Sequence, residues 1–376
     1  MSKNLNGAPP RASPVSSRRR SLVLAPFAAA ALGAARRSRA QAAAPLRVGF
    51  IYVRPVGEAG WSYQHDLGRR EMQQALGDRV NTRYVESVPE GADAERVMRD
   101  LAAQGERLIF ATSFGYLEPA LRVAADFPET SFEHCGGYKS APNLGTYNAR
   151  YYEGRYLAGL VAGSATRSGV AGYVAGFPVP EVIQGINAFA LGMRAVNAKA
   201  RVRVLWLDSW FDPARERDAA LALAARGADV LTNHSASPAV ALAAESRGVM
   251  CIGYQSDMRA FAPHTQLTAV VHEWGGYYTR VAQAVLDGRW TPRPVWGGIG
   301  DGFIRMAPFG PAVAQATAAL VQQRQTRIMT GKMHPFSGRL VDNTGRPRHD
   351  GDAMSDAAIR QMDWFVDGVV GTLPGR

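Results

Sequence analysis

The sequence contains only two cysteines among its 376 residues, Cys135 and Cys251, one in each half of the chain. Two cysteines are too few for a zinc site of the CxxC type, although in an exported protein they could form one disulfide bond. We expect two separate, buried thiols at strand ends, because free cysteine is among the most buried residue types.

The sequence motifs of several large enzyme classes are absent. There is no GxxxxGK[ST] phosphate loop, no HExxH, no GxSxG, and no GxGxxG after the first apolar run. His272 and Glu273 begin the HExxH pattern, but the second histidine is missing. We therefore predict a protein that is not an enzyme and that has no catalytic residues, no metal site and no cofactor.

Acidic residues are absent from residues 1–44, which contain 8 of the 43 Lys and Arg residues of the chain. The rest of the chain has 35 basic and 32 acidic residues, so its formal charge is +3, compared with +11 for the whole sequence. A nearly balanced charge gives no indication of nucleic-acid binding, and we expect no nucleic-acid partner.

Residues 1–44 have the layout of a cleaved export signal. A basic group that includes Arg18 and Arg19 precedes an apolar stretch, Leu22 to Ala35, that is too short to span a bilayer. The paired arginines resemble a twin-arginine signal, and the general secretory route is the alternative. No cysteine lies near the cleavage region, so we expect a soluble periplasmic protein without a lipid anchor.

After residue 44, apolar runs alternate with segments of helical periodicity. This alternation predicts the α/β class with doubly wound parallel sheets. The predicted strands are 47–53, 81–86, 108–112, 131–135, 169–174, 202–207, 229–232, 249–253 and 267–271. The predicted helices include 151–163, 181–196, 213–225, 238–246, 277–286 and 311–329. Some 330 residues are more than one core usually holds, so we expect two lobes.

The order of these elements predicts that the chain passes between the two lobes more than once. The predicted parts are an export signal, 1–44; an N-terminal lobe, 45–150 plus 268–290; and a C-terminal lobe, 151–267 plus 291–376. Crossings are expected near residues 147–150, 254–268 and 290–300. Such crossings would form a multi-strand hinge with a ligand-binding cleft between the lobes.

Large aromatic residues recur just after the strand-like runs, at Trp61, Phe114, Phe177, Trp210 and Trp274. In an open α/β sheet, these positions line the ligand crevice. Aromatic rings there would suit a planar ligand, because ring pairs gain roughly 0.5–1.5 kcal/mol beyond the burial of their area. Any one of them could equally be a core residue, since aromatics dominate cores as well as binding sites.

Four segments are distinctive: Gly60–Gln64, Thr112–Tyr116, Tyr147–Gly159 and Gly253–Asp257. With them, residues 47–310 resemble the basic membrane protein (BMP) family. Its members are solute-binding proteins of ABC importers, and several bind purine bases or purine nucleosides. The resemblance implies a type I periplasmic-binding-protein fold, a small-molecule purine ligand, and membrane permease and ATPase partners. We expect a monomer.

In this family the base lies between aromatic rings, while Asp or Asn side chains bind its polar edge. The resemblance therefore implies a set of ligand-contacting residues in this chain. The stacking candidates are Trp61 or Tyr63, Phe177 or Trp210, and Phe114, with Trp274 as a further aromatic candidate, and the polar candidates are Ser62, Asn148 and Asp257.

The chain departs from the nucleoside-binding members at two acidic positions. Those members tend to have Asp-Lys-Ser-Phe-Asn in place of Gly60–Gln64, and Gly-Val-Asp-x-Asp in place of Gly253–Asp257. Two carboxylates suited to ribose hydroxyls are thus replaced by Gly60 and Gln255. These changes favour a smaller, flatter ligand, and we predict the free base adenine. A nucleoside-binding protein, a sugar-binding protein, a ligand-sensing module and a nucleosidase are the alternatives.

Overall fold

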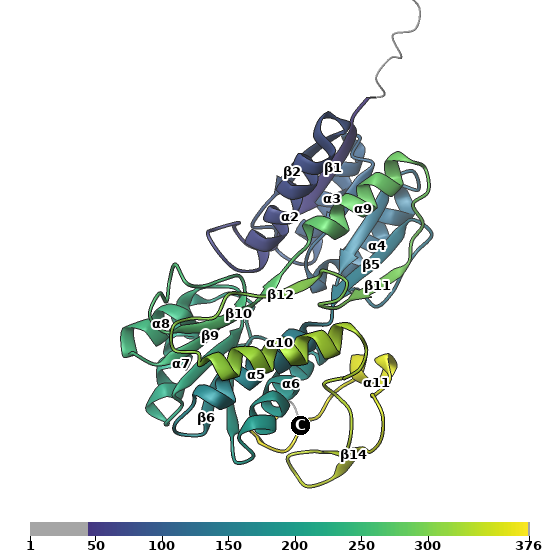
Figure 1. The fold of residues 1–376 in the computed structure, drawn as a ribbon. Helices are drawn as coiled ribbons and strands as arrows, with labels where there is room; N and C mark the ends of the chain where they lie inside the picture. The colour runs from purple at the N-terminus through teal and green to yellow at the C-terminus, as the bar shows by residue number, and fades with distance from the viewer. Residues whose placement is uncertain (1–43, 375–376) are drawn as a thin grey trace, which may run out of the picture. The chain divides into compact units, whose positions relative to one another are not determined.

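The computed structural model describes residues 44–374 (Figure 1). The export signal predicted for residues 1–44 lies, apart from Ala44, outside the described residues. Two parallel-sheet lobes make up the described part, which confirms the predicted doubly wound α/β class. None of the helices in this part combines the length and the apolar character that a membrane span requires.

The first lobe is built on a parallel six-stranded sheet in the order β11-β5-β4-β3-β1-β2. Its strands are β1 (Leu46–Ile51), β2 (Val80–Val85), β3 (Leu108–Ala111), β4 (Ser131–Cys135), β5 (Leu144–Ala149) and β11 (Pro294–Gly297). Its helices are α2 (Trp61–Leu76), α3 (Ala92–Ala103), α4 (Leu117–Asp126) and α9 (Gly275–Leu286). All four residues of β3 are buried, as expected for a strand covered on both faces.

The second lobe is built on a seven-stranded sheet in the order β12-β10-β9-β8-β6-β7-β15, in which only β12 is antiparallel to its neighbour. Its strands are β6 (Val170–Ala175), β7 (Arg201–Trp206), β8 (Val230–His234), β9 (Met250–Gln255), β10 (Gln266–His272), β12 (Ile304–Met306) and β15 (Val369–Val370). Its helices are α5 (Tyr151–Ala165), α6 (Pro180–Val196), α7 (Pro213–Ala225), α8 (Ala239–Arg247), α10 (Gln315–Met329) and α11 (Asp356–Arg360). The strands β13 (Leu340–Val341) and β14 (Pro347–His349) form a separate pair.

Glycines allow α5 and α6 to pack closely. A Cβ added at Gly159 would lie 2.2 Å from the carbonyl oxygen of Phe189, and one at Gly192 would lie 2.1 Å from that of Tyr156. The two helix backbones are therefore in direct contact, which only glycine permits. This contact gives a structural reason for Gly159 in the distinctive segment Tyr147–Gly159.

The paths of two strands correct the predicted lobe boundaries. The structure pairs β10 with β9 in the second sheet, whereas the prediction placed residues 268–290 in the first lobe. Conversely, β11 pairs with β5 in the first sheet, although residues 291–376 were assigned to the second lobe. The pattern of a single strand does not specify which sheet it joins, because that choice depends on long-range pairing.

The chain crosses between the lobes after β5, after β10 and after β11. The first and third crossings lie close to the predicted ones near 147–150 and 290–300. The second crossing lies between His272 and Gly275, so its prediction at 254–268 was wrong. These three crossings make up the hinge between the lobes.

Both cysteines are free and buried, which confirms their prediction as separate thiols. Cys135 is the last residue of β4, and Cys251 lies in β9.

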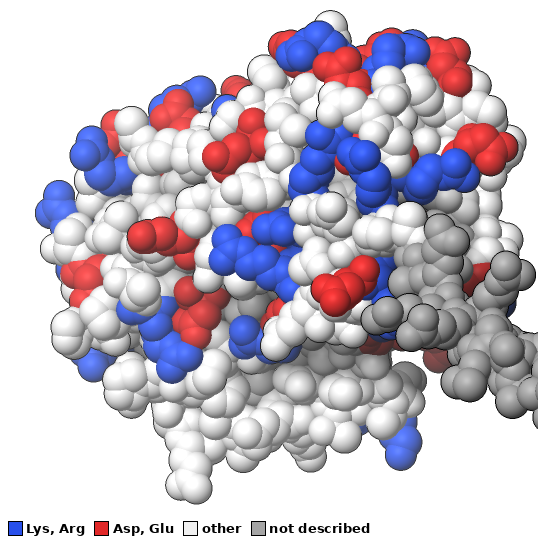
Figure 2. Space-filling model, turned by 90° about the horizontal axis from the view of Figure 1, so that it is seen from above, with Lys and Arg blue, Asp and Glu red and all other residues white. Residues whose placement is uncertain are grey.

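Charged side chains of both signs are interspersed over the face shown in Figure 2. This mixed pattern agrees with the nearly balanced charge of the sequence after residue 44.

Candidate ligand-binding site

A cavity of about 600 Å³ lies between the two lobes. The first lobe lines it with the loops that follow β1, β3 and β4 and with the end of β5, and the second lobe lines it with the N-terminus of α6 and the ends of β8 and β9. Its volume is within the range of about 300–1,000 Å³ that is typical of small-molecule sites. Its position at the carboxyl ends of parallel strands is where open α/β sheets bind ligands.

Aromatic rings from both lobes line the cavity. Trp61 and Phe114 come from the first lobe and Trp210 from the second, so the structure brings together three of the predicted stacking residues. The Trp61 ring is held by its Nε1–H, which donates to the carbonyl oxygen of Thr112 at 2.6 Å. Tyr138 was missed, although it follows β4 as the other aromatics follow their strands, and its ring centroid lies 6.1 Å from that of Phe114.

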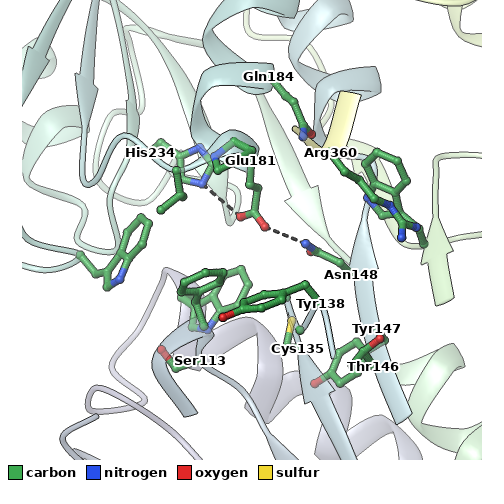
Figure 3. A pocket seen from close by; sticks show the side chains of 18 of the residues that line it. Ser113, Cys135, Tyr138, Thr146, Tyr147, Asn148, Glu181, Gln184, His234 and Arg360 are labelled. Atoms are coloured by element: carbon green, nitrogen blue, oxygen red, sulfur yellow. Dashed lines mark hydrogen bonds and ion pairs between the residues drawn. The ribbon is translucent and has the colours of Figure 1, made fainter. Parts of the chain in front are cut away.

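A hydrogen-bonded carboxylate joins the two lobes inside the cavity (Figure 3). Asn148, on β5 of the first lobe, donates through Nδ2 to Glu181 Oε2 at 2.7 Å. Glu181 lies in the first turn of α6 in the second lobe, where the helix dipole favours a negative charge. His234 Nε2 lies 3.6 Å from Glu181 Oε1, and burial lowers the pKa of His234, so its ring is neutral at neutral pH.

Gln255 supplies an amide to the cavity wall. The residue is 4% exposed, has a φ of 67°, and its Oε1 is buried without a hydrogen-bond partner. Buried polar atoms are nearly always hydrogen-bonded, and this oxygen is buried without a protein partner while the residue as a whole lines the cavity. The sequence comparison singled out Gln255 as a lost carboxylate but not as a contact residue.

The two lobes meet at Gly60. Its backbone N–H donates to Ser256 Oγ of the second lobe at 2.9 Å, and Gln64 Nε2 donates to the same oxygen, also at 2.9 Å. Gly60 has a φ of +96°, and a Cβ there would lie 2.1 Å from the carbonyl oxygen of Ala236. The structure is therefore a closed form in which a side chain at position 60 would collide with the opposite lobe.

Three predicted residues on α2 and at the hinge lie outside the cavity lining. Ser62 and Tyr63 follow Trp61 on the helix, and each helical step of about 100° turns the side chain away from the cavity. Ser62 lines a separate, smaller pocket. Trp274 is 1% exposed and stacks on His65 with a centroid distance of 4.8 Å, so it belongs to the hinge core.

Two predicted residues of the second lobe also lie outside the cavity lining. Phe177 packs edge-on against Trp210, with ring centroids 4.9 Å apart, and so supports the wall from behind. Asp257 forms an ion pair with Arg259 and accepts a hydrogen bond from Gln266 Nε2 at 2.7 Å. These five residues thus lie outside the cavity lining, whereas Trp61, Phe114, Asn148 and Trp210 line the cavity.

Other lining residues had no signal in the sequence. They are polar or charged side chains on α6, on β8 and in the C-terminal segment, with one tryptophan on β11: Glu181, Gln184, His234, Arg360, Gln361 and Trp296. Helix periodicity predicted α6, but it did not indicate that its first turn faces the other lobe. Within residues 44–374, no group of three His, Cys, Asp or Glu side chains is arranged to hold a metal ion.

Two α/β lobes that enclose a small-molecule cavity at a three-crossing hinge define a solute-binding protein of the type I periplasmic class. Residues 46–333 match the family Bmp, described as ABC transporter substrate-binding protein PnrA-like, and the chain belongs to this family. The predicted family is thereby confirmed. As a substrate-binding component, the protein has a small-molecule ligand and works with the membrane components of a transporter.

Two curated relatives extend over most of the chain. A purine-binding protein of Brucella abortus (strain 2308) is 46% identical over 354 residues, which cover 94% of this chain and 100% of the relative. A putative ABC transporter glucose-binding protein of Haloferax volcanii is 35% identical over 329 residues, covering 88% of this chain and 81% of the relative.

Solved structures support the fold. A solute-binding protein of an ABC transporter system from Conexibacter woesei superposes with a TM-score of 0.65 at 22% identity, covering 77% of this chain and 98% of that chain. One from Aeropyrum pernix superposes with a TM-score of 0.66 at 18% identity, covering 77% and 93%. At these identities the likeness concerns the fold alone.

Proposed function

We propose that the protein is an exported, periplasmic purine-binding component of an ABC importer and that its ligand is the free base adenine. The observation that carries this proposal is the combination of aromatic rings on both sides of the cavity with the side-chain amide of Gln255 in its wall. The 46% identity to a purine-binding protein supports the ligand class.

A glutamine amide is chemically matched to adenine. In DNA recognition, Asn and Gln bind adenine through two hydrogen bonds, in which the amide oxygen accepts from N6–H and the amide nitrogen donates to N7. The side-chain amide of Gln255, a residue that lines the cavity, has both the acceptor and the donor of such a pair. Flat aromatic rings such as Trp61 and Trp210 supply the stacking surfaces.

The free base fits the hydrogen-bonding capacity of the cavity better than a nucleoside does. Each buried polar group left unsatisfied costs about 1–3 kcal/mol, so ribose hydroxyls need partners. Position 60 is a glycine in contact with the opposite lobe, and position 255 is a neutral amide. The carboxylate of Glu181 is already engaged by Asn148.

A sugar-binding protein is the second candidate, because the Haloferax relative is described as a putative glucose-binding protein. Aromatic rings also stack on the faces of sugar rings. However, a sugar needs polar partners around its whole rim, and Glu181, the one carboxylate among the lining residues, already accepts a hydrogen bond from Asn148. We therefore rank the purine first.

Mass spectrometry of small molecules released from the purified, denatured protein tests this proposal. We expect a purine base, and recovery of a hexose instead would favour the sugar-binding alternative.

Incubation with adenosine tests the nucleosidase alternative, for which release of adenine would be the positive result. N-terminal sequencing of periplasmic protein tests export, since we expect loss of roughly the first 40 residues. Retention of Met1 would contradict cleavage.

A further inference from the structure

The C-terminal segment, residues 334–374, lies beyond the part of the chain that matches the family. It contains β13, β14, α11 and β15, and its apolar side chains are buried in the main core. These buried side chains include Phe336, Leu340, Ile359, Met362, Phe365 and Val366. The segment is therefore an integral part of the second lobe, and we call it the strap.

The strap is fixed to α6 by buried side-chain amides. Asn187 donates through Nδ2 to the carbonyl oxygen of Trp364 at 2.8 Å and accepts through Oδ1 from the N–H of Val366 at 3.0 Å. One turn earlier on the helix, Gln184 donates to the carbonyl oxygen of Ile359 at 2.8 Å. Glu181 lies on this helix as well, so α6 positions both the strap and the Glu181 carboxylate in the cavity.

The strap also reaches residues of the first lobe and the hinge. Asp356 forms an ion pair with Arg150 at 2.8 Å, just before α5. The guanidinium of Arg360 lies 4.5 Å from the ring centroid of Trp296, and that of Arg150 lies 5.1 Å from it. Trp296 is on β11 of the first sheet and donates through Nε1 to the carbonyl oxygen of Ala149 at 3.0 Å.

Arg360, Gln361 and Trp296 all line the ligand cavity. Arg360 is labelled in Figure 3, where it lies on the side of the cavity formed by Gln184 and Asn148. Arg360 belongs to the second lobe and Trp296 to the first, so their contact spans the cavity wall where the lobes meet.

We propose that the strap forms one wall of the ligand site and that the contact between Arg360 and Trp296 closes this wall, so that Arg360 controls access to the cavity. The proposal does not depend on which ligand binds. At an exposed site, the attraction of a cation to an aromatic ring changes the equilibrium between the formed and the broken contact by about two- to fivefold. Loss of the contact is expected to increase access by that factor.

Cys135 provides a readout of access that needs no ligand. It lines the cavity, whereas Cys251 is buried in the core of the second lobe and does not line it. A Cys251→Ala background leaves Cys135 as the only thiol. The rate of its reaction with methyl methanethiosulfonate is measured at one fixed pH. Because this reagent is uncharged, removal of an arginine does not change its electrostatic attraction to the cavity.

In this background, Arg360→Ala should raise the reaction rate about two- to fivefold. Arg346→Ala is the matched control, because Arg346 is an exposed arginine of the same strap that does not line the cavity. Trp296→Leu should raise the rate as well, and the double variant should be no faster than the faster single one. A rate in Arg360→Ala equal to that of the background would overturn the proposal.

The ligand readout separates this proposal from the proposed function. With adenine, Arg360→Ala should increase the dissociation rate about two- to fivefold, while Arg346→Ala leaves it unchanged. If adenine does not bind the unsubstituted protein, the ligand assignment fails, and the thiol rates still decide the role of the strap. Thermal unfolding at an unchanged temperature in both variants excludes a loss of folding as the cause.

Discussion

Gly60 and Ala236 touch across the ligand cleft, so closely that a Cβ on Gly60 would lie 2.1 Å from the carbonyl oxygen of Ala236. Such a Cβ would be closer than van der Waals contact, so one of the two lobes would have to move to make room for it. The absence of a side chain at position 60 is thus required for the closed form itself, in addition to any effect on ribose binding.

Gly60→Ala should therefore weaken ligand binding at least tenfold, a loss of about 1.4 kcal/mol. Gly91→Ala is the matched control, because Gly91 precedes α3 as Gly60 precedes α2 and has a similar φ, +94°, but a Cβ there would meet nothing within 4 Å. Both variants share the backbone strain, so they should unfold at similar temperatures. Equal ligand affinities of the two variants by calorimetry would show that the contact with Ala236 does not matter for closure.

The hydrogen bond between Asn148 and Glu181 should contribute to closure, since its donor and acceptor belong to different lobes. Hydrogen bonds to charged groups contribute about 1.5–3 kcal/mol, so Glu181→Gln should weaken binding by roughly ten- to a hundredfold. Asp218→Asn removes an exposed carboxylate on α7 and serves as the control. Unchanged affinity of Glu181→Gln in a titration would contradict a role of this pair.

Ligand binding should change the fluorescence of the tryptophans in the cavity wall. Trp61 and Trp210 line the cavity, whereas Trp274 is buried at the hinge. The ligand-induced change should persist in Trp274→Phe and decrease in Trp210→Phe. If the change instead disappears only in Trp274→Phe, then Trp274 is the reporting residue and the cavity wall has been misassigned.

Stability should depend on the protonation of Glu133, a buried carboxyl group of the first lobe. Burial raises its pKa from 4.5 to about 7, although Tyr277 Oη–H and Trp290 Nε1–H both donate to it. The folded state thus holds the proton more tightly than the unfolded state, so stability decreases as the pH rises from about 4.5 to about 7.

A shift of this size corresponds to a stability difference on the order of 3 kcal/mol. Glu133→Gln removes the titration, because an amide does not ionise in this pH range. The two contacts can be kept, since a glutamine can still accept from Trp290 and donate to the Tyr277 oxygen. Thermal unfolding from pH 4.5 to 7.5 should therefore show a shallower decline for Glu133→Gln than for the unsubstituted protein. Parallel pH profiles for the two proteins would mean that Glu133 does not titrate in this range.

The fold could be predicted from local patterns because each strand and helix has its own periodicity. Strand β4 was predicted at its observed bounds, and α7 likewise. Assignment of β10 and β11 to their sheets could not be predicted, because it depends on pairing between strands far apart in the sequence. Most of the strap was missed for a similar reason, since its short elements are held by contacts with α6 and β7, which lie far away in the sequence.

The site was predicted in part, for the same physical reason. Phe114, which follows β3, was predicted because the end of a parallel strand faces the cleft, and Asn148, near the end of β5, was implied by the family resemblance. Trp274 follows a strand too, but its strand leads into the hinge, so the ring is buried. Glu181 could not be found from the sequence, because its role depends on the approach of the opposite lobe.

The measurement that tests the purine assignment most directly is calorimetric titration of the ligand-free protein with adenine, adenosine, hypoxanthine and glucose under identical conditions. Adenine should bind most tightly, at least tenfold tighter than adenosine, a difference of about 1.4 kcal/mol, because no free carboxylate at positions 60 and 255 satisfies the ribose hydroxyls. Tighter binding of adenosine would contradict the preference for the free base, and binding of glucose alone would contradict the purine assignment altogether.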